Sequence, residues 1–334
     1  MAKDTALNEK EAEGIRPNLG MQILHRVTGS REAGIAVVLL VSIVLLSLAT
    51  PNFFTVSNLA IVARQISLFG IIAIGMTMVI LLGDIDLSVG SVVALGSVVT
   101  GYALVRMGLP IPLGILAGLA VGALVGFTNG TIIIRTGVPS FIVTLGMMGI
   151  ARGAALVITK GSTISGLPPA FFSVGQGFVY GVPVPVIICI VLAILAHIFL
   201  SRTTIGRHIY FIGSNPEAAL LSGINVSRVK LLVFTLASTL AAVEAVIETS
   251  RMSTAQPAAG VGYELTAIGA VIIGGASLFG GEGTILGTIL GATLLGLITN
   301  GLILLGVSAY WQQVFSGSII ILAVTLDMWR QRRS

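Results

Sequence analysis

Charged side chains are almost absent from this chain beyond residue 32. The 334 residues include 18 Lys or Arg and 13 Asp or Glu, and ten of these 31 lie in the first 32 positions. Soluble domains carry about a quarter charged residues, because charge covers their water-facing surface. This distribution excludes a soluble enzyme, a disordered protein and a nucleic-acid-binding protein. It predicts an all-α polytopic membrane protein, surrounded by membrane lipids.

Ten apolar segments approach the length of about 20 residues that a helix needs to cross a membrane. We expect these spans at 33–50, 60–82, 87–106, 111–134, 139–159, 182–200, 229–249, 265–279, 284–305 and 311–328. The eighth, 265–279, is short and rich in glycine, which makes it a candidate for a broken helix. Arg64 and Arg152 lie within two of the spans, and we expect their side chains to extend to the membrane surface.

The positions of Lys and Arg predict the orientation, since cytoplasmic loops carry an excess of both. Five precede the first span, four lie in the loop 201–230, and three follow the last span. Six spans before this loop and four after it place all three regions on one side. We therefore expect a cytoplasmic tail at 1–32, a membrane domain at 33–328 with a cytoplasmic loop at 201–228, and a cytoplasmic C-terminal tail at 329–334.

Glycine recurs every fourth residue in the fourth and ninth spans. The two series are Gly114, Gly118, Gly122, Gly126 and Gly130, and Gly283, Gly287 and Gly291. This spacing lets the backbone of a neighbouring helix approach closely, and it predicts helix-packing faces. The same two spans, which run in opposite directions, carry Asn-Gly pairs at 129–130 and 300–301. These pairs indicate an inverted repeat that relates spans two to five to spans seven to ten.

Carboxyl groups at membrane depth are costly and often functional. Asp86 lies between the second and third spans, where it either caps the third helix or forms a cation or proton site. Glu244 lies in the seventh span, one turn before Glu248, which we expect to pair with Arg251. Glu244 is either part of an ion-pair cluster near the interface or a proton-coupling carboxylate.

The loop 201–228 contains the signals of one short helix. Ser214 or Asn215 can cap its start, Pro216 suits its first position, and Glu217 complements the helix dipole. Gly223 ends it. Between two spans, such a helix is either a docking element or a brace that ties the two halves of the protein together.

Sequence signatures of catalysis are absent from the chain. It contains no P-loop for ATP, no HExxH pair for a metal, and no serine with the His and Asp neighbours of a triad. Its single cysteine, Cys189, excludes an internal disulfide. We therefore expect a protein that is not an enzyme and that binds no cofactor and no metal.

Four stretches of the chain form a distinctive set. They are Pro51-Asn52-Phe53-Phe54-Thr55 with Asn58-Leu59, then Ile85 to Ser91, then Gly206-Arg207 to Asn225, and finally Ser253 and Ala255-Gln256-Pro257 through Gly262-Tyr263-Glu264-Leu265 to Gly280-Gly281. Together they resemble the permease subunit of carbohydrate-importing ABC transporters, in the branch that includes the ribose permease. The resemblance covers about residues 35–328.

This resemblance implies a fold and a set of partners. The fold would be the ten-helix bundle of the vitamin-B12-type, or type II, ABC importers, in the inner membrane of a bacterium. The permease would form a homodimer, or a heterodimer with a paralogue, around a central path. An ABC ATPase, often a tandem chain, would bind on the cytoplasmic side, and a periplasmic or lipid-anchored sugar-binding protein would dock on the other. The cargo would be a monosaccharide, with ribose or a related pentose or hexose expected.

The resemblance also suggests functional residues. The loop helix would be the coupling helix that contacts the ATPase, with Gly206, Arg207, Gly213, Asn215, Pro216, Glu217, Ala218, Gly223 and Ile224 as the coupling residues. Polar residues expected to face the translocation path are Gln65, Asp86, Ser88, Asn129, Ser140, Thr144 and Asn300. Such side chains offer the donors and acceptors that sugar hydroxyls require.

Three acidic residues depart from the pattern of similar permeases. Those proteins often have glycine at the position of Asp84, an apolar or small residue at Glu244, and a basic residue at Glu282. The extra carboxyl groups are either packing variants or part of the path. A different class of protein, a stand-alone carrier driven by protons or sodium, would need a buried titratable residue in the path, and Asp86 or Glu244 would supply it.

Overall fold

The computed structural model describes residues 31–308, together with 310–312, 314, 315, 317, 318, 321 and 325. The expected tails at 1–32 and 329–334, and the tenth expected span at 311–328, lie wholly or mainly outside these residues. Nine of the ten expected spans coincide with a helix. These helices are α2 (Arg31–Ala49), α3 (Val56–Leu81), α4 (Val89–Val105), α5 (Ile111–Thr136), α6 (Ser140–Thr159), α8 (Val184–Arg202), α11 (Val226–Met252), α12 (Tyr263–Ile273) and α13 (Ile285–Leu304).

Six helices of the described chain are long and apolar enough to cross a membrane, which makes this a multi-pass membrane protein. They are α3, α5, α6, α8, α11 and α13; α2, α4 and α12 carry shorter apolar stretches. At about 1.5 Å per residue, the 11 residues of α12 cover only about half of a 30 Å hydrocarbon core. The expectation of a broken helix at the eighth span is therefore confirmed.

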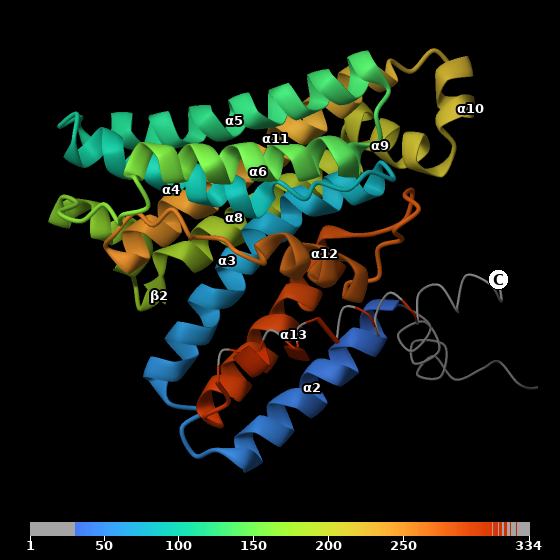
Figure 1. Ribbon diagram of the computed structural model, residues 1–334. Helices are drawn as coiled ribbons and strands as arrows, with labels where there is room; N and C mark the ends of the chain where they lie inside the picture. The colour runs from blue at the N-terminus through green and yellow to red at the C-terminus, as the bar shows by residue number, and fades with distance from the viewer. Residues whose placement is uncertain are drawn as a thin grey trace, which may run out of the picture.

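Two connections mark opposite ends of the bundle. Between α6 and α8 lie η1 (Pro169–Phe172), α7 (Ser173–Gln176) and an antiparallel hairpin of β1 (Phe178–Val179) and β2 (Val182–Pro183), in which Val179 pairs with Val182. Between α8 and α11 lie α9 (Thr204–Ser214) and α10 (Pro216–Leu221). Figure 1 shows the two connections at opposite ends, which we call the hairpin end and the α10 end.

The sequence predicted one short helix in the loop 201–228, and the structure has two. The second, α10, is the predicted one. The first, α9, has only 11 residues, and its apolar run after Arg207 and His208 spans only Ile209 to Ile212, which is too short to indicate a helix by itself. It is helical because Ile209 and Ile212 fall on one face and are completely buried against the core of the bundle.

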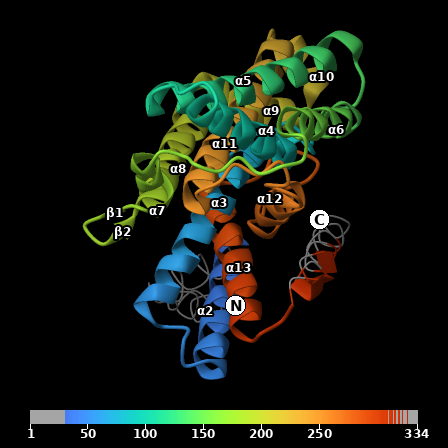
Figure 2. The same cartoon turned by 60° about the vertical axis from the view of Figure 1, so that its left-hand side comes forward.

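The glycine series of α5 forms a packing face, as predicted. All five glycines are buried. Gly114 and Gly118 lie against Leu104 and Thr100 of α4, and the other three lie against the backbone and side chains of α11 between Leu231 and Ala242. In Figure 2, α5 runs along α11 and α4 at one side of the molecule, while α2 and α13 extend from the other side. Small residues therefore bring these helices close together without a polar bond.

Two interruptions meet inside the bundle. Residues 82–88 separate α3 from α4, and residues 253–262 separate α11 from α12. The helices α4 and α12 start close together, where Gly90 lies against Gly260. They then run to opposite ends: α4 ends beside Phe171 of η1, whereas the loop after α12 packs Gly280 against Gly213 of α9. We call the meeting point of the two segments the crossing.

Candidate functional site

The segment 82–88 belongs to no helix or strand; its first three amides bond to carbonyls of α3, and two side chains of α6 accept bonds from its middle. Ser140 Oγ accepts a bond from the amide of Ile85 at 3.2 Å, and Thr144 Oγ1 accepts one from the amide of Leu87 at 3.1 Å. Buried backbone amides inside a membrane need such partners, because no water is present to replace them. Ser140 and Thr144 therefore fix the backbone position of this segment relative to α6.

Asp86, Ser88 and Asn129 form one buried network at the start of α4. Asp86 Oδ1 accepts bonds from the amide of Ser88 at 2.8 Å and from its hydroxyl at 2.6 Å, and Asn129 Nδ2 donates to Ser88 Oγ at 3.0 Å. All three side chains are completely buried. Asp86 thus satisfies one free amide at the helix start, which is the capping role considered for it. Its Oδ2 and the Oδ1 of Asn129 have no hydrogen-bond partner within the described part of the chain.

Arg152 of α6 joins the segment 253–262 to the start of α4. Its Nη1 donates to the carbonyl oxygens of Pro257 at 2.9 Å and Ala259 at 2.6 Å, and its Nη2 donates to that of Gly90 at 3.3 Å. The expectation that this side chain extends to the membrane surface is therefore wrong. Carbonyl groups that lack a helical partner compensate its charge inside the protein. Arg64, by contrast, reaches the hairpin end, where it donates to the carbonyl of Gln176 and lies over the ring of Phe178.

The crossing itself has room only for glycine. A side chain at Gly90 would overlap the carbonyl oxygen of Gly260 and the carboxyl group of Glu264. Gly260 also has a φ of +69°, a conformation that favours glycine. The two backbones are therefore in direct contact, and any change in the position of one segment acts on the other.

The remaining predicted path residues lie elsewhere. Asn300 exchanges two hydrogen bonds, of 2.8 and 3.2 Å, with Asn58, which ties α13 to α3. Gln65 is half-buried on α3. The structure thus brings five of the seven predicted residues together at the crossing, and sequence reasoning missed Arg152 as their neighbour. An arginine in the middle of an apolar span was the available signal.

The last turns of α11 carry two carboxyl groups with different environments. Glu248 accepts two bonds from Arg251, Nε to Oε2 at 2.8 Å and Nη2 to Oε1 at 3.0 Å, which confirms the predicted pair. Glu244 is completely buried, and neither of its oxygens has a partner among the residues that the structure describes. The described residues contain no group of three His, Cys, Asp or Glu side chains placed to hold a metal ion.

The helix α10 has the start and end that its sequence predicts. The side chain of Asn215 accepts a bond from the amide of Ala218 at 2.9 Å, Pro216 takes the first position, and Gly223 ends the helix region with a φ of +79°. Two leucines face outward from this helix, Leu220 with 66% and Leu221 with 88% of its surface exposed. Arg207 and Glu217 are also exposed, whereas Ala218 and Ile224 are half-buried.

The helix α9 connects α10 with the end of α3 and with the loop 274–284 that follows α12. Gly213 packs directly against the carbonyl oxygen of Leu81 and the amide of Gly281, and the Tyr210 hydroxyl donates to the carbonyl of Gly283 at 2.9 Å. Burial raises the pKa of the Tyr210 phenol, so this group remains a donor at neutral pH. At the other end of α9, Gly206 lies against the backbone of Leu200. The helix α9 thus packs at one end against α8 and at the other against the end of α3 and the loop after α12.

Comparison with known proteins identifies similar chains. A model of the family described as branched-chain amino acid transport system / permease component matches residues 58–324. The ribose import permease protein RbsC of Escherichia coli strain K12 is 44% identical over 301 residues, which cover 88% of this chain and 93% of that protein. The fructose import permease protein FrcC of Rhizobium meliloti is 35% identical, with 92% and 88% covered. The L-arabinose ABC transporter permease protein AraH of Azospirillum brasilense is 38% identical, with 91% and 90% covered. No solved structure matches the chain.

Proposed function

Because this chain belongs to the family of branched-chain amino acid transport system permease components, we propose that it is the membrane-spanning permease subunit of an ATP-driven monosaccharide importer, with ribose as its cargo. The observation that carries the proposal is the 44% identity with a ribose import permease along 88% of the chain. Relatives named for fructose and L-arabinose support the carbohydrate class. The subunit provides the path, and a partner subunit hydrolyses ATP.

The proposed architecture is a type II bundle of ten spans built from two inverted repeats, α3 to α6 and α11 to the segment 311–328. The helix packing supports it. In one half, α4 packs against α5 and α11, and in the other half α12 packs against α13 and α3. The two short helices also start together and run to opposite ends of the bundle, as an inverted repeat requires.

We propose that the α10 end faces the cytoplasm and docks the ATPase subunit. The family resemblance implies that this subunit is often a tandem chain. The Lys and Arg content of the α10 end supports this orientation, with both termini on the same side. Leu220 and Leu221 supply an exposed apolar contact on a short helix with a fixed start and end. Residues 206–224 would then couple the two subunits.

The proposed mechanism follows from the packing of α9. Closure of the ATPase around ATP displaces α10, and the contact of Gly213 with Leu81 and Gly281 passes this displacement to the end of α3 and to the loop 274–284 after α12. The end of α3 leads through the segment 82–88 into α4, and α4 and α12 start together at the crossing, so both sides of the crossing move together between two arrangements of the path. Asp86, Ser88, Asn129, Ser140 and Thr144 set the shape of the path there. A sugar-binding protein at the hairpin end delivers the cargo, and a second copy of the permease completes the path.

Reconstitution tests this function. The permease, its ATPase and its binding protein, placed together in liposomes, are expected to take up ribose only when ATP is supplied. Uptake driven by a proton or sodium gradient without the ATPase would instead support a secondary carrier, in which the unpartnered Glu244 would be the coupling group.

Docking of the ATPase is tested separately, by introducing a charged side chain on α10. Leu221→Asp is expected to abolish co-purification with the ATPase, because it places a carboxylate in an apolar contact. Tyr180→Asp is the matched control, since it introduces the same charge at a fully exposed position of the hairpin end. Equal co-purification of both variants would contradict the coupling assignment.

A further inference from the structure

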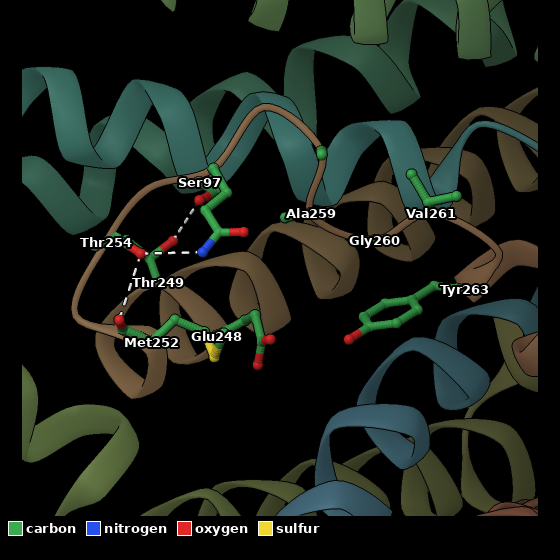
Figure 3. A pocket seen from close by; sticks show the side chains of 11 residues that line it. Ser97, Glu248, Thr249, Met252, Thr254, Ala259, Gly260, Val261 and Tyr263 are labelled. Carbon is green, nitrogen blue, oxygen red and sulfur yellow. Dashed lines mark hydrogen bonds between the residues drawn. The ribbon is translucent and has the colours of Figure 1, made fainter. Parts of the chain in front are cut away.

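A pocket of about 220 Å³ opens beside the crossing, on the side toward the hairpin end (Figure 3). Its walls come from α4, the last turns of α11, the segment 254–261 and the first residue of α12. Six polar side chains line it: Ser97, Glu248, Thr249, Thr254, Gln256 and Tyr263. Gln256 and Tyr263 belong to the fourth distinctive stretch of the sequence, and neither has a role in the coupling described above.

The backbone around this pocket requires contact with water or protein. Residues 253–262 form no helix, yet they lie at the depth where α4 and α12 begin. Irregular backbone at membrane depth occurs only where it is buried in protein or lines a water-filled space. Arg152 satisfies the carbonyls of Pro257 and Ala259, but Ala258 and Val261 are exposed. The open side of the pocket therefore faces an aqueous path and not lipid.

The charges in the pocket balance each other. Glu248 is 8% exposed, and both of its oxygens are held by the guanidinium group of Arg251. The pair carries no net charge, so the pocket offers no strong attraction to a cation or an anion. A carboxylate has about four acceptor positions, and Arg251 occupies two of them. Glu248 can thus still accept bonds from the hydroxyl groups of a neutral solute.

Tyr263 and Gln256 offer further donors and acceptors. The ring of Tyr263 is fixed edge-to-face against Phe69, with centroids 5.7 Å apart. Figure 3 shows its hydroxyl directed into the pocket toward Glu248, and no residue of the described chain is hydrogen-bonded to this hydroxyl. Gln256 Nε2 donates to Thr254 Oγ1 at 3.2 Å, which orients the amide at the opposite wall.

We infer that this pocket is a binding site for one monosaccharide on the translocation path, an inference that rests on the proposed transport function. Glu248 and Gln256 accept bonds from sugar hydroxyls, and Tyr263 donates one from a ring that packing holds in place. The volume lies below the roughly 300–1,000 Å³ of pockets for drug-sized ligands, which suits a single small solute. The permease thus contributes to sugar selection beside its binding protein.

The test uses the complete transporter in liposomes, with ribose-loaded binding protein at saturating concentration, so that affinity of the binding protein does not limit the rate. Sugar uptake and ATP hydrolysis are measured together, for ribose and for 2-deoxyribose. Tyr263→Phe keeps the ring contact with Phe69 and removes only the hydroxyl, and Gln256→Ala removes the amide. Tyr102→Phe is the control, because it removes a hydroxyl from an exposed side chain of α4 that does not line the pocket.

Each pocket variant is expected to lower the ribose transported per ATP hydrolysed by about 2- to 10-fold, the effect of one lost hydrogen bond. The ratio of ribose to 2-deoxyribose uptake is expected to change as well, whereas a purely structural role would lower both sugars equally. Wild-type ratios in both variants, or an equal loss for both sugars, would overturn the binding site while leaving the transport function intact. Absence of ATP-dependent uptake by the wild-type complex would overturn the transport function, and the binding site with it.

Discussion

Lys230 Nζ lies 2.8 Å from Asp84 Oδ2, and this ion pair joins the start of α11 to the interrupted segment after α3. Only 11% of the Asp84 side chain and 25% of the Lys230 side chain are exposed. The pair lies at the α10 end, where α11 follows α10 directly in the chain. The carboxyl group at position 84 is therefore a structural partner of Lys230. It fastens the segment 82–88 to the helix that follows α10 in the chain.

Loss of either charge is expected to weaken this connection. Asp84→Asn and Lys230→Met should each lower the thermal unfolding temperature in detergent and reduce ATP-dependent uptake, because each leaves a partly buried charge without its partner. A double-mutant cycle is expected to give an interaction energy of about 0.5–3 kcal/mol. The reversed pair, Asp84→Lys with Lys230→Asp, should regain part of the stability. Additive effects of the two single changes would show that the pair makes no contribution.

Arg152→Lys is expected to loosen the crossing. Lysine keeps the charge, but it lacks the planar fork that reaches the carbonyls of Pro257, Ala259 and Gly90 together. Loss of one or two charge-assisted bonds should cost about 2–3 kcal/mol. The measurement is the rate of thiol labelling in an Ala258→Cys background, where Cys189 is buried and stays unlabelled.

Labelling at position 258 should become faster in the Arg152→Lys variant and stay constant in Arg135→Lys. Arg135 is the matched control, because it lies exposed in the last turn of α5. Equal labelling rates in the two variants would mean that the carbonyl contacts of Arg152 do not hold the segment.

Glu244→Gln is expected to leave folding and uptake unchanged. The carboxyl group is completely buried and has no hydrogen-bond partner among the residues that the structure describes, so no hydrogen bond there offsets the cost of a charge, and an amide of the same shape fits the same space. Glu244→Lys should lower the unfolding temperature strongly, because it adds length and a charge to a packed interior. Thermal unfolding and uptake are measured on both variants. A folded Glu244→Gln protein without uptake would assign the carboxyl group a direct part in transport.

The length of the apolar segments predicted ten spans, and nine of them coincide with a helix, because span length follows from the thickness of a membrane. The helix α9 escaped prediction since its apolar run, Ile209 to Ile212, is only four residues long and finds its partner only in the folded bundle. The direction of α12 could not be predicted either. Eleven residues do not reveal that they begin at the crossing and lead toward α9; only the contacts of Gly260 and Gly280 show this.

The polar residues near the crossing were predicted as a group, but the hydrogen bonds between them were not. Asp86, Ser88 and Asn129 are rare polar groups in apolar surroundings, so composition alone singled them out. Asn300 carried the same signal, yet its partner Asn58 lies 242 residues away in the sequence. Arg152 was placed wrongly, because three carbonyl partners from two distant segments compensate its charge, and no local pattern shows them.

The glycine face of α5 gives a matched pair of substitutions. Gly126→Ala would place a methyl group against the carbonyl of Phe234 and 2.8 Å from Ser238 Cβ, whereas a methyl group at Gly149 of α6 meets no atom within 4 Å. We expect Gly126→Ala to cost about 1–3 kcal/mol through overpacking of α5 against α11. Gly149→Ala should be neutral or stabilising by up to about 1 kcal/mol, because alanine favours the helix. Thermal unfolding in detergent measures both. Since the two changes are chemically identical, equal unfolding temperatures would contradict the close approach of α5 and α11, and a lower value for Gly126→Ala alone would confirm it.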